Sequence, residues 1–381
     1  MKIVIASGIY PPDIGGPATY SRLIAREFIK RNINVSLICY SDKEDEPFDR
    51  EEKFKIVRVV RKKFFLFRYL SYFFNLYKLA RHCDVVYAQG PLGAGLPAIA
   101  VSRILGKKFV IKIVGDYAWE QGVNQFGVKD SIEEFQTRRY DRKTESIWKI
   151  QKGVVKSADK IITPSQFLKK IIKGWGAKEQ KINVIYNAGP EISFIEKIEK
   201  KPNQKGDILI SSARLEPWKG MTTLVEIMPD LLKKNPNFKL VIVGSGPEGE
   251  KIKILIRNLH LEKEIELIDK VPHEELMAYF KASKIFILNT GYEGLPHIIL
   301  EAMACNLSVI TTNVCGNPEV VENGYNGLLV EYNNKTQLKE AILKLWSEEK
   351  IREKFVKNSK EILKKFTIEE MINKTIKTLN F

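Results

Sequence analysis

The sequence predicts an α/β protein built from two doubly wound domains. A chain of 381 residues exceeds what one ordinary hydrophobic core organises. Short Val/Ile/Leu-rich runs alternate with helical stretches, and this alternation starts again after a polar stretch at residues 191–207. Because alternating strands and helices favour parallel sheets covered on both faces, each half of the chain is expected to form its own sheet.

Two series of strands are expected. The first comprises residues 2–7, 35–40, 55–60, 85–89, 109–114 and 160–163, and the second comprises residues 208–212, 240–243, 264–267, 285–288, 308–311 and 327–330. This divides the chain into a first domain over 1–190 and a second over 191–359. After residue 336 the chain is expected to be helical, with a last helix over about 360–381 that could pack back on the first domain.

Composition indicates the class of protein and its compartment. An apolar fraction of 44% with 10% aromatic residues is typical of a globular protein. The four cysteines are widely spaced and form no C-x-x-C motif, which favours buried thiols in a reducing compartment. The apolar N-terminal run is too short for a signal peptide. We expect a cytoplasmic protein, with any membrane contact peripheral and at the inner face of the cell membrane.

Two carboxylates flank a loop-to-helix junction in the second domain. Glu293 and Glu301 follow the expected strand 285–288, and Pro296 suits the first position of a helix. The first amides of that helix would point beyond the carboxyl end of the strand, where open α/β sheets bind ligands. The segment Glu293-Gly294-Leu295-Pro296-His297, with Glu301, therefore predicts a site for a polyhydroxylated anionic ligand such as a sugar nucleotide.

Cations and glycines follow other strands. Arg214 and Lys219 could neutralise a diphosphate, or could be solvated charges of a loop. Gly244 and Gly246 allow either a nucleoside contact or a simple tight turn, and residues 269–273 could border the base.

In the first domain, Gly15 and Gly16 come after the first strand and before a helix. Adjacent glycines there would let backbone amides approach phosphate or sugar oxygens. The alternative is a flexible loop.

Residues 53–81 form a basic aromatic stretch with nine Lys or Arg and no acidic residue. Six of its apolar residues recur at helical spacing and form a stripe: Leu66, Tyr69, Leu70, Phe73, Phe74 and Tyr77. Part of this stripe is expected to cover the sheet of the first domain. The surplus of cations and rings predicts a helix on an anionic membrane surface. A net charge of +16 fits an anionic partner of any kind, but no motif supports nucleic-acid binding, and we expect none.

Five motifs in order resemble the retaining glycosyltransferases of family 4, whose GT-B architecture has two facing Rossmann-like domains with an interdomain cleft. The resemblance covers nearly the whole chain. It rests on residues 11–17, residues 212–215 with 219–220, residues 243–247, residues 292–296 with Glu301, and residues 316–330.

The resemblance implies a role for each residue. Glu301 would hold the ribose, Glu293 the donor sugar, and Arg214 with Lys219 the diphosphate leaving group. Similar enzymes need no cofactor and no metal, because two cations and a helix dipole can stabilise the leaving group. They often carry a histidine where this chain has Gly115. Asp116 could then contact sugar or acceptor, or could cap the next helix.

The sequence therefore predicts a metal-independent retaining hexosyltransferase that uses a nucleotide sugar, with UDP- or GDP-sugars favoured. The expected acceptor is a glycan or a polyprenyl or other lipid-linked hydroxyl, in cell-surface polysaccharide or glycolipid synthesis. The alternatives are a sugar-nucleotide hydrolase or epimerase of the same fold, or a non-catalytic basic protein that binds lipid or nucleic acid.

Overall fold

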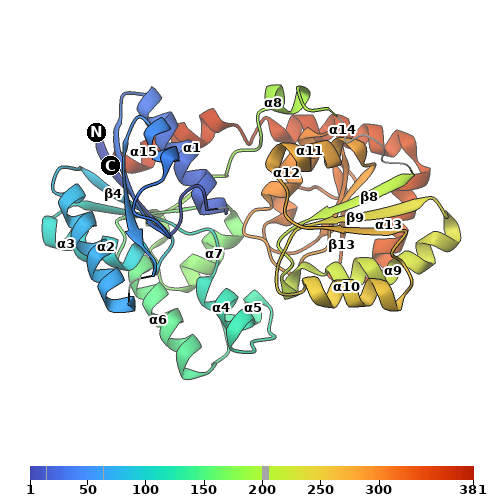
Figure 1. The fold of residues 1–381 in the computed structure, drawn as a ribbon, viewed down its shortest axis with the longest axis horizontal. Helices are drawn as coiled ribbons and strands as arrows, with labels where there is room; N and C mark the ends of the chain where they lie inside the picture. The colour runs from blue at the N-terminus through green and yellow to red at the C-terminus, as the bar shows by residue number, and fades with distance from the viewer. Residues whose placement is uncertain (14, 63, 200–205) are drawn as a thin grey trace. The chain divides into compact units, whose positions relative to one another are not determined.

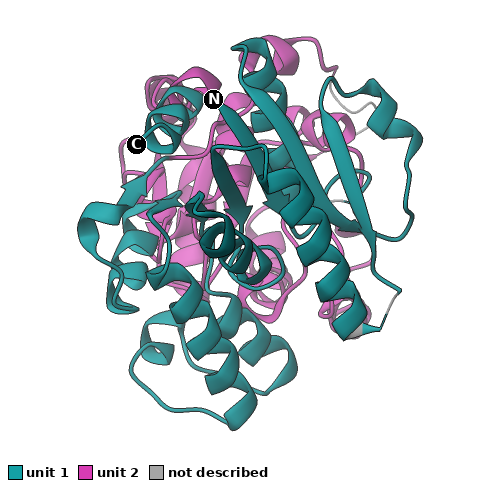
Figure 2. Cartoon of the chain, turned by 90° about the vertical axis from the view of Figure 1, so that its left-hand side faces the viewer, with its two compact units in different colours: residues 1–185, 371–381 teal, residues 186–370 magenta. Residues whose placement is uncertain are grey.

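A computed structural model describes residues 1–13, 15–62, 64–199 and 206–381 of the chain (Figure 1). The chain divides into two compact units (Figure 2). Unit 1 contains Met1–Ile185 and Met371–Phe381, and unit 2 contains Tyr186–Glu370. We placed the boundary after residue 190 and expected a last helix over about 360–381; residues 371–381 of the chain belong to unit 1.

Unit 1 contains a seven-stranded parallel sheet with the order β3-β2-β1-β4-β5-β6-β7. Its strands are β1 (Lys2–Ser7), β2 (Asn34–Ser41), β3 (Lys55–Val60), β4 (Val85–Gln89), β5 (Lys108–Lys112), β6 (Lys160–Thr163) and β7 (Ile182–Val184). Its helices are α1 (Gly16–Lys30), α2 (Phe65–Ala80), α3 (Gly95–Leu105), α4 (Tyr117–Gln125), α5 (Ile132–Phe135), α6 (Arg142–Lys156) and α7 (Gln166–Gly174), with the 3-10 turns η1 (Pro47–Glu51) and η2 (Glu179–Lys181). The central strand β4 is buried along its whole length, as a sheet covered on both faces requires.

Unit 2 contains a six-stranded parallel sheet with the order β10-β9-β8-β11-β12-β13. Its strands are β8 (Asp207–Ser212), β9 (Phe238–Val243), β10 (Ile265–Ile268), β11 (Ile285–Leu288), β12 (Ser308–Thr312) and β13 (Gly327–Val330). Its helices are α8 (Ile192–Glu196), α9 (Met221–Lys234), α10 (Gly249–Asn258), α11 (His273–Ala282), α12 (His297–Ala304), α13 (Lys335–Ser347) and α14 (Glu349–Leu363), with η3 (Pro217–Lys219) and η4 (Asn317–Glu319). In both sheets the order reverses beside the first strand, which creates the switch point where such folds bind ligands.

The structure confirms the doubly wound fold and places a strand at every expected segment, with ends that differ by at most two residues. The edge strand β7 was not expected, because a three-residue strand is too short to show a pattern. The segment 191–207, expected to be a polar linker, contains α8, and its residues 200–205 lie outside the described ranges.

The last helix, α15 (Ile368–Leu379), crosses the boundary between the two units. Ile372, Thr375 and Leu379 of α15 are fully buried. Thr375 of α15 lies close to the Tyr20 hydroxyl of α1, and α15 lies beside α1 in Figure 1. The C-terminal helix is therefore part of the unit 1 fold.

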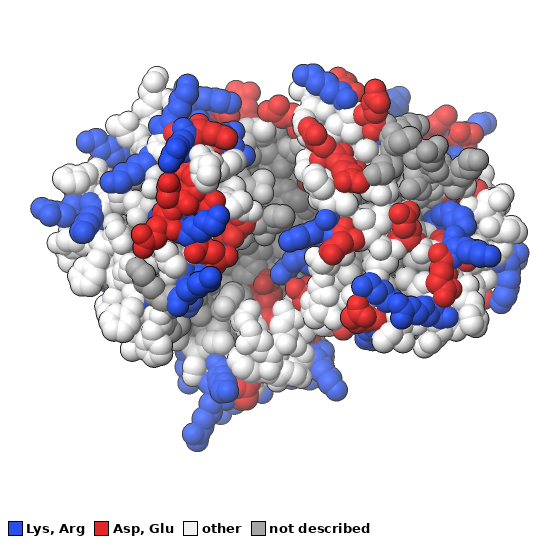
Figure 3. Space-filling model, in the orientation of Figure 1, with Lys and Arg blue, Asp and Glu red and all other residues white. Residues whose placement is uncertain are grey.

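Charges and hydropathy complete the description of the surface. On the face drawn in Figure 3, basic and acidic side chains are interspersed, so the net charge of +16 does not form one continuous basic patch on that face. None of the helices in the described ranges combines the length and the hydropathy that a bilayer span needs.

Candidate functional site

The candidate site lies at the carboxyl edge of the unit 2 sheet, where the loop after β11 leads into α12. Glu293 lies in this loop, and α12 begins at His297. The predicted helix start was one residue early, because Pro296 is the N-cap. The N–H of His297 donates to the Leu295 carbonyl at 3.0 Å, so this first amide is already used within the protein.

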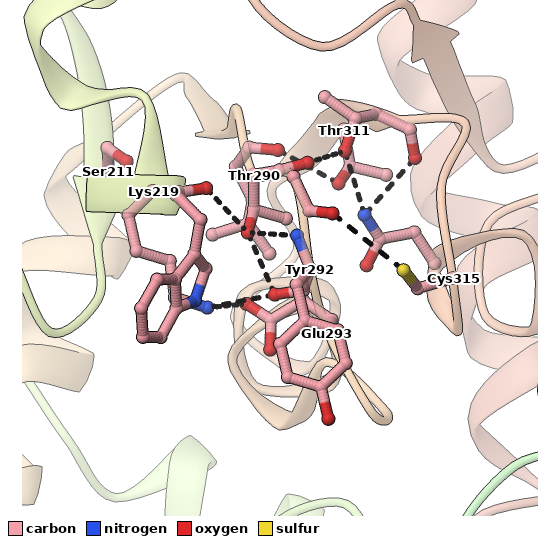
Figure 4. A network of polar contacts seen from close by, with 12 residues as sticks. Ser211, Lys219, Thr290, Tyr292, Glu293, Thr311 and Cys315 are labelled. Atoms are coloured by element: carbon pink, nitrogen blue, oxygen red, sulfur yellow. Dashed lines mark hydrogen bonds and ion pairs between the residues drawn. The ribbon is translucent and has the colours of Figure 1, made fainter. Parts of the chain in front are cut away.

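Lys219 and Glu293 form a buried ion pair in this site (Figure 4). Lys219 Nζ lies 2.5 Å from Glu293 Oε1 and 3.3 Å from the Tyr292 carbonyl oxygen. Lys219 is only 7% exposed, so its charge depends on these acceptors and not on water. An ammonium has three N–H donors, and two acceptors occupy two of them. The third can serve an anionic ligand.

Gly220 brings the Lys219 loop against the Glu293 loop. Its φ of 53° is left-handed, and a Cβ there would lie 2.4 Å from Asn289 Nδ2. Asn289 Nδ2 instead donates to the Gly220 carbonyl at 3.0 Å. A larger residue at this position would therefore separate the cation from its carboxylate.

Buried polar side chains below the loop hold Glu293 in place. Thr290 Oγ1 donates to the Tyr292 carbonyl at 3.0 Å, and Thr312 Oγ1 donates to the Thr290 carbonyl at 2.5 Å. Asn317 Nδ2 then donates to the Thr312 carbonyl at 3.1 Å. Sequence reasoning missed these residues, because their role depends on tertiary contacts between β11, β12 and η4 and not on a local pattern.

Arg214, the second predicted phosphate ligand, is in a different environment. Its side chain is 68% exposed, and Nη1 lies 3.2 Å from Glu216 Oε1. Within the described residues, it makes no hydrogen bond to Lys219 or Glu293. Arg214 is thus an exposed cation that follows β8 in the chain, and its role as a phosphate ligand stays a prediction.

The predicted glycines Gly244 and Gly246 pack against the Arg214 segment. A Cβ on Gly244 would lie 2.0 Å from the Ala213 carbonyl oxygen, and one on Gly246 would lie 2.6 Å from the Leu215 carbonyl oxygen. Close approach of two backbones therefore explains both glycines. Whether they also contact a nucleoside stays a prediction.

Gly294 and Leu295 have structural roles within the Glu293 loop. The Leu295 side chain belongs to the buried core of unit 2, so only its backbone can face a ligand. The Gly294 carbonyl oxygen would be 2.4 Å from a Cβ on Gly316, whose N–H donates to the Glu293 carbonyl at 3.1 Å. These contacts fix the backbone on both sides of the carboxylate.

Glu301, one turn into α12, pairs with a histidine from α11. His273 Nε2 lies 3.1 Å from Glu301 Oε1, and the His273 ring stacks on Phe194 at 5.7 Å between centroids. Glu301 raises the pKa of His273 above its ordinary value of 6.5. Sequence reasoning placed His273 only near the base, since its partner lies 28 residues away in the sequence.

In unit 1, Gly15 is the N-cap of α1 and Gly16 is its first residue. The Gly15 carbonyl accepts from the Ala18 N–H at 3.0 Å. Arg58 holds the preceding loop, because its Nη2 donates to the Pro11 carbonyl at 2.6 Å. Sequence reasoning treated Arg58 only as one cation of the basic aromatic stretch. Residue 14 lies outside the described ranges.

Asp116 is fully buried and is the N-cap of α4. Its Oδ1 accepts from the Trp119 N–H at 3.1 Å and from Gln151 Nε2 at 2.9 Å, while Oδ2 accepts from Gln136 Nε2 at 2.9 Å. Burial raises the pKa of Asp116, and these hydrogen bonds oppose the shift. Of the two roles considered for Asp116, capping is the one that this geometry favours.

Across the described ranges, no group of three or more His, Cys, Asp or Glu side chains is arranged to hold a metal ion. Independence from metal stays a prediction.

Comparison with known proteins identifies the family of this chain. Residues 14–188 match the family Glycosyltransferase Family 4, and residues 193–362 match Glycosyl transferases group 1. An uncharacterised glycosyltransferase of Methanocaldococcus jannaschii is 28% identical, over 96% of this chain and 94% of that protein. The alpha-monoglucosyldiacylglycerol synthase of Streptococcus pneumoniae is 23% identical, over 84% of this chain and 72% of that protein.

Solved structures share the fold at low sequence identity. Sucrose-phosphate synthase from Thermosynechococcus elongatus superposes with a TM-score of 0.81 at 19% identity, covering 99% of this chain and 97% of that one. Anabaena HepE in complex with UDP and glucose superposes with a TM-score of 0.80 at 19% identity, covering 100% and 99%. The chain therefore belongs to the family 4 glycosyltransferases and has the GT-B fold.

Proposed function

We propose that this enzyme transfers a sugar, with retention of anomeric configuration, from a nucleotide-sugar donor to a hydroxyl of a glycan or lipid-linked acceptor. The proposal rests mainly on the Lys219–Glu293 pair at the carboxyl edge of the unit 2 sheet. A single buried ammonium there can hold the sugar-binding carboxylate with one N–H and a diphosphate oxygen with another.

Each residue has a chemical task in this proposal. Glu293 accepts hydrogen bonds from the donor sugar, and Glu301 accepts them from the ribose. Lys219 and Arg214 stabilise the negative charge that grows on the diphosphate as the glycosidic bond breaks. The acceptor hydroxyl attacks the anomeric carbon on the face from which the diphosphate departs, so the step needs no protein nucleophile. The bond between the anomeric carbon and the diphosphate oxygen breaks, the bond to the acceptor oxygen forms, and the hydroxyl proton passes to the departing phosphate oxygen. No metal is required.

A UDP-sugar is the favoured donor. The Anabaena structures that share this fold were solved with UDP, and with UDP-glucose. A GDP-sugar is the second candidate, since Glu301, Lys219 and Arg214 are assigned here to the ribose and the diphosphate, which UDP and GDP share.

The acceptor is proposed to be lipid-linked because α2 presents an apolar surface. Five large side chains in and just before this helix are between 51% and 69% exposed: Phe64, Leu66, Phe67, Leu70 and Phe74. On the opposite side, Tyr72 and Leu76 are fully buried in the unit 1 core. The helix therefore needs only one of its two apolar faces for the fold, and the other can insert into a bilayer interface. Such an enzyme would act in cell-surface polysaccharide or glycolipid synthesis at the inner face of the membrane.

The cations of this segment support the membrane contact less than the sequence predicted. Arg58 is bound inside unit 1 by Asp49, and Arg61 pairs with Asp13. Five other cations of residues 53–81 are exposed: Lys53, Lys55, Lys62, Lys78 and Arg81. Arg58 and Arg61 are therefore committed to contacts within unit 1, while the exposed cations can add to the contact that the apolar residues make.

Binding and turnover assays test the proposal. The protein is titrated with UDP, GDP and ADP by calorimetry. It is then incubated with labelled sugar conjugates of the nucleotide that binds, together with a lipid extract of cell membranes and EDTA. We expect label in a lipid-extractable product whose anomeric configuration, by NMR, matches the donor. Free sugar or an epimerised donor without transfer would indicate the hydrolase or epimerase alternative, and a protein that binds none of the nucleotides would refute the donor assignment.

A further inference from the structure

We propose that His273 is a positioning residue for nucleotide binding: it fixes the Glu301 carboxylate at the ribose position and makes nucleotide affinity depend on its own protonation. This inference rests on the proposed function, because it assumes that Glu301 accepts hydrogen bonds from ribose. It adds a residue that acts through Glu301 and that the family-based assignment does not include.

The geometry restrains His273 from two directions. It is the first residue of α11, and it follows the N-cap Pro272. Phe194 from α8 lies parallel to the imidazole, with an angle of 12° between the ring planes. At the edge of the ring, His273 Nε2 lies 3.1 Å from Oε1 of Glu301 in α12, and the carboxylate accepts a hydrogen bond there. Three elements of unit 2 therefore meet at this side chain, which limits the rotamers that both His273 and Glu301 can adopt.

The pair leaves ligand-binding capacity on the carboxylate. His273 uses Glu301 Oε1, and within the described residues Oε2 accepts no hydrogen bond from the protein. The Glu301 side chain is 22% exposed, so a ligand can reach it. Lys219 holds Glu293 through Oε1 in the same manner. Each carboxylate of the site thus has one oxygen held by a cation or histidine and one available for hydroxyl groups.

The charges around the imidazole favour its protonated form. Glu301 makes the largest contribution to the raised pKa of His273, and Glu274 of the same helix adds to it. Partial burial opposes them, and so does the positive end of the α11 dipole. From α8, the side chain that stacks on the imidazole is the uncharged Phe194. Because the net shift is upward, His273 keeps its proton to a higher pH than a free histidine.

Loss of that proton should weaken the hold on Glu301. A charge-assisted hydrogen bond is stronger than the one that a neutral imidazole donates. As pH rises through the raised pKa of His273, the carboxylate becomes more mobile and nucleotide affinity should fall. The diphosphate itself also titrates near neutral pH, but it does so equally in every variant. The informative quantity is therefore the difference between variants.

The test compares His273→Gln and His273→Ala with the wild type and with His260→Gln, a matched change at an exposed histidine of the same unit. Calorimetry gives the dissociation constants for UDP and for 2′,3′-dideoxy-UDP between pH 6 and pH 8.5, with the corresponding guanosine nucleotides in parallel. His273→Gln can still donate to Glu301 but cannot titrate, so it should bind UDP at pH 8.5 as well as the wild type and lack the wild type's additional loss of affinity. His273→Ala should weaken UDP binding by about tenfold, the equivalent of one charge-assisted hydrogen bond.

The dideoxynucleotide separates positioning from a general structural role. His273→Ala should bind 2′,3′-dideoxy-UDP as well as the wild type does, since the ribose hydroxyls are absent. Equal losses for both nucleotides would overturn the inference, as would tighter UDP binding in His273→Ala or an unchanged pH dependence in His273→Gln. A wild-type protein that binds no nucleotide would instead refute the proposed function.

Discussion

Both carboxylates of the unit 2 site are held by groups from other elements, Glu293 by Lys219 of η3 and Glu301 by His273 of α11, and this determines how substitutions will behave. Lys219 and Glu293 are both largely buried, with side chains 9% and 17% exposed. Removing either partner leaves the other charge without compensation, which costs far more than the pair itself contributes. An alanine at Glu293 would therefore disturb folding and chemistry together, and an isosteric amide is the better probe.

Glu293→Gln should keep the fold and nucleotide affinity but lose transfer. The amide oxygen can still accept from Lys219, while the negative charge that we propose orients the donor sugar is gone. Urea unfolding, UDP calorimetry and turnover measured on the same variant check this. A parallel loss of UDP affinity and of turnover would show that Glu293 binds the nucleotide and not the sugar.

Lys219→Met and Arg214→Ala should weaken diphosphate binding by different routes. Lys219→Met should also destabilise the protein by about 3 kcal/mol, because it leaves Glu293 buried and unpaired. Arg214→Ala should leave stability unchanged, since this side chain is 68% exposed. Comparing UDP with uridine isolates the phosphate contribution. Wild-type affinity for UDP in the double variant would refute the phosphate assignment.

Asp116 is predicted to matter for stability and not directly for chemistry. Asp116→Ala should destabilise unit 1 by about 2 kcal/mol, because the Trp119 N–H and the amides of Gln136 and Gln151 lose their acceptor inside the protein. Urea unfolding measures the loss. Full stability together with a large fall in turnover would instead place Asp116 among the catalytic residues.

At the scale of single residues, the sequence identified groups that belong to a local motif and missed those that act across the fold. Glu293, Glu301 and Lys219 could be found because strand, loop and helix signals surround them. Asn289, Thr290 and Arg58 could not, because hydrogen bonds between distant segments define their roles. Gly244 and Gly246 were noticed for ligand contact, whereas the structure gives a backbone-packing reason for them.

At the scale of elements, α2 shows what a periodic pattern can and cannot specify. The helix was predicted from an apolar stripe of six residues, part of which was expected to cover the sheet: Leu66, Tyr69, Leu70, Phe73, Phe74 and Tyr77. Phe73 and Tyr77 do pack against the unit 1 core, beside the fully buried Tyr72 and Leu76, whereas Leu66, Leu70 and Phe74 are exposed. Because both faces of α2 are apolar, periodicity predicts the helix but does not select the face that packs on the sheet.

The exposed face of α2 should bind anionic membranes. Replacing Leu66, Phe67, Leu70 and Phe74 together with Ser should weaken binding to phosphatidylglycerol vesicles, measured by sedimentation, by at least about tenfold, since a single fully inserted side chain already contributes about 1.5 kcal/mol or more. The matched control replaces Ile104 and Ile254, which are exposed on other helices, with Ser. Unchanged sedimentation would contradict the prediction. Dissociation of an oligomer by the same variant would show that α2 binds a second copy of the chain.

At the scale of the whole molecule, alternation of strands and helices was enough to predict two doubly wound units, because each strand signal depends on local sequence. The division of the chain between the units was harder. The final helix is amphipathic, and a pattern of this kind shows that a face is buried without showing where. Only the structure shows that residues 371–381 return to unit 1.

This return predicts that damage to the C-terminus will weaken the N-terminal unit. Ile372→Ala should lower the stability of unit 1 by about 2–5 kcal/mol, because the side chain is fully buried and leaves a cavity. The matched control is Leu338→Ala, an equally buried residue in the core of unit 2. Hydrogen exchange read by mass spectrometry should show faster exchange within 1–185 for the first variant and within 186–370 for the second. If Ile372→Ala accelerated exchange in unit 2 instead, α15 would belong energetically to unit 2. Unit 1 contains residues 371–379 of α15 as well as the exposed face of α2. The Ile372→Ala variant should therefore bind vesicles like the wild type while unit 1 is folded, and should lose this binding when unit 1 unfolds.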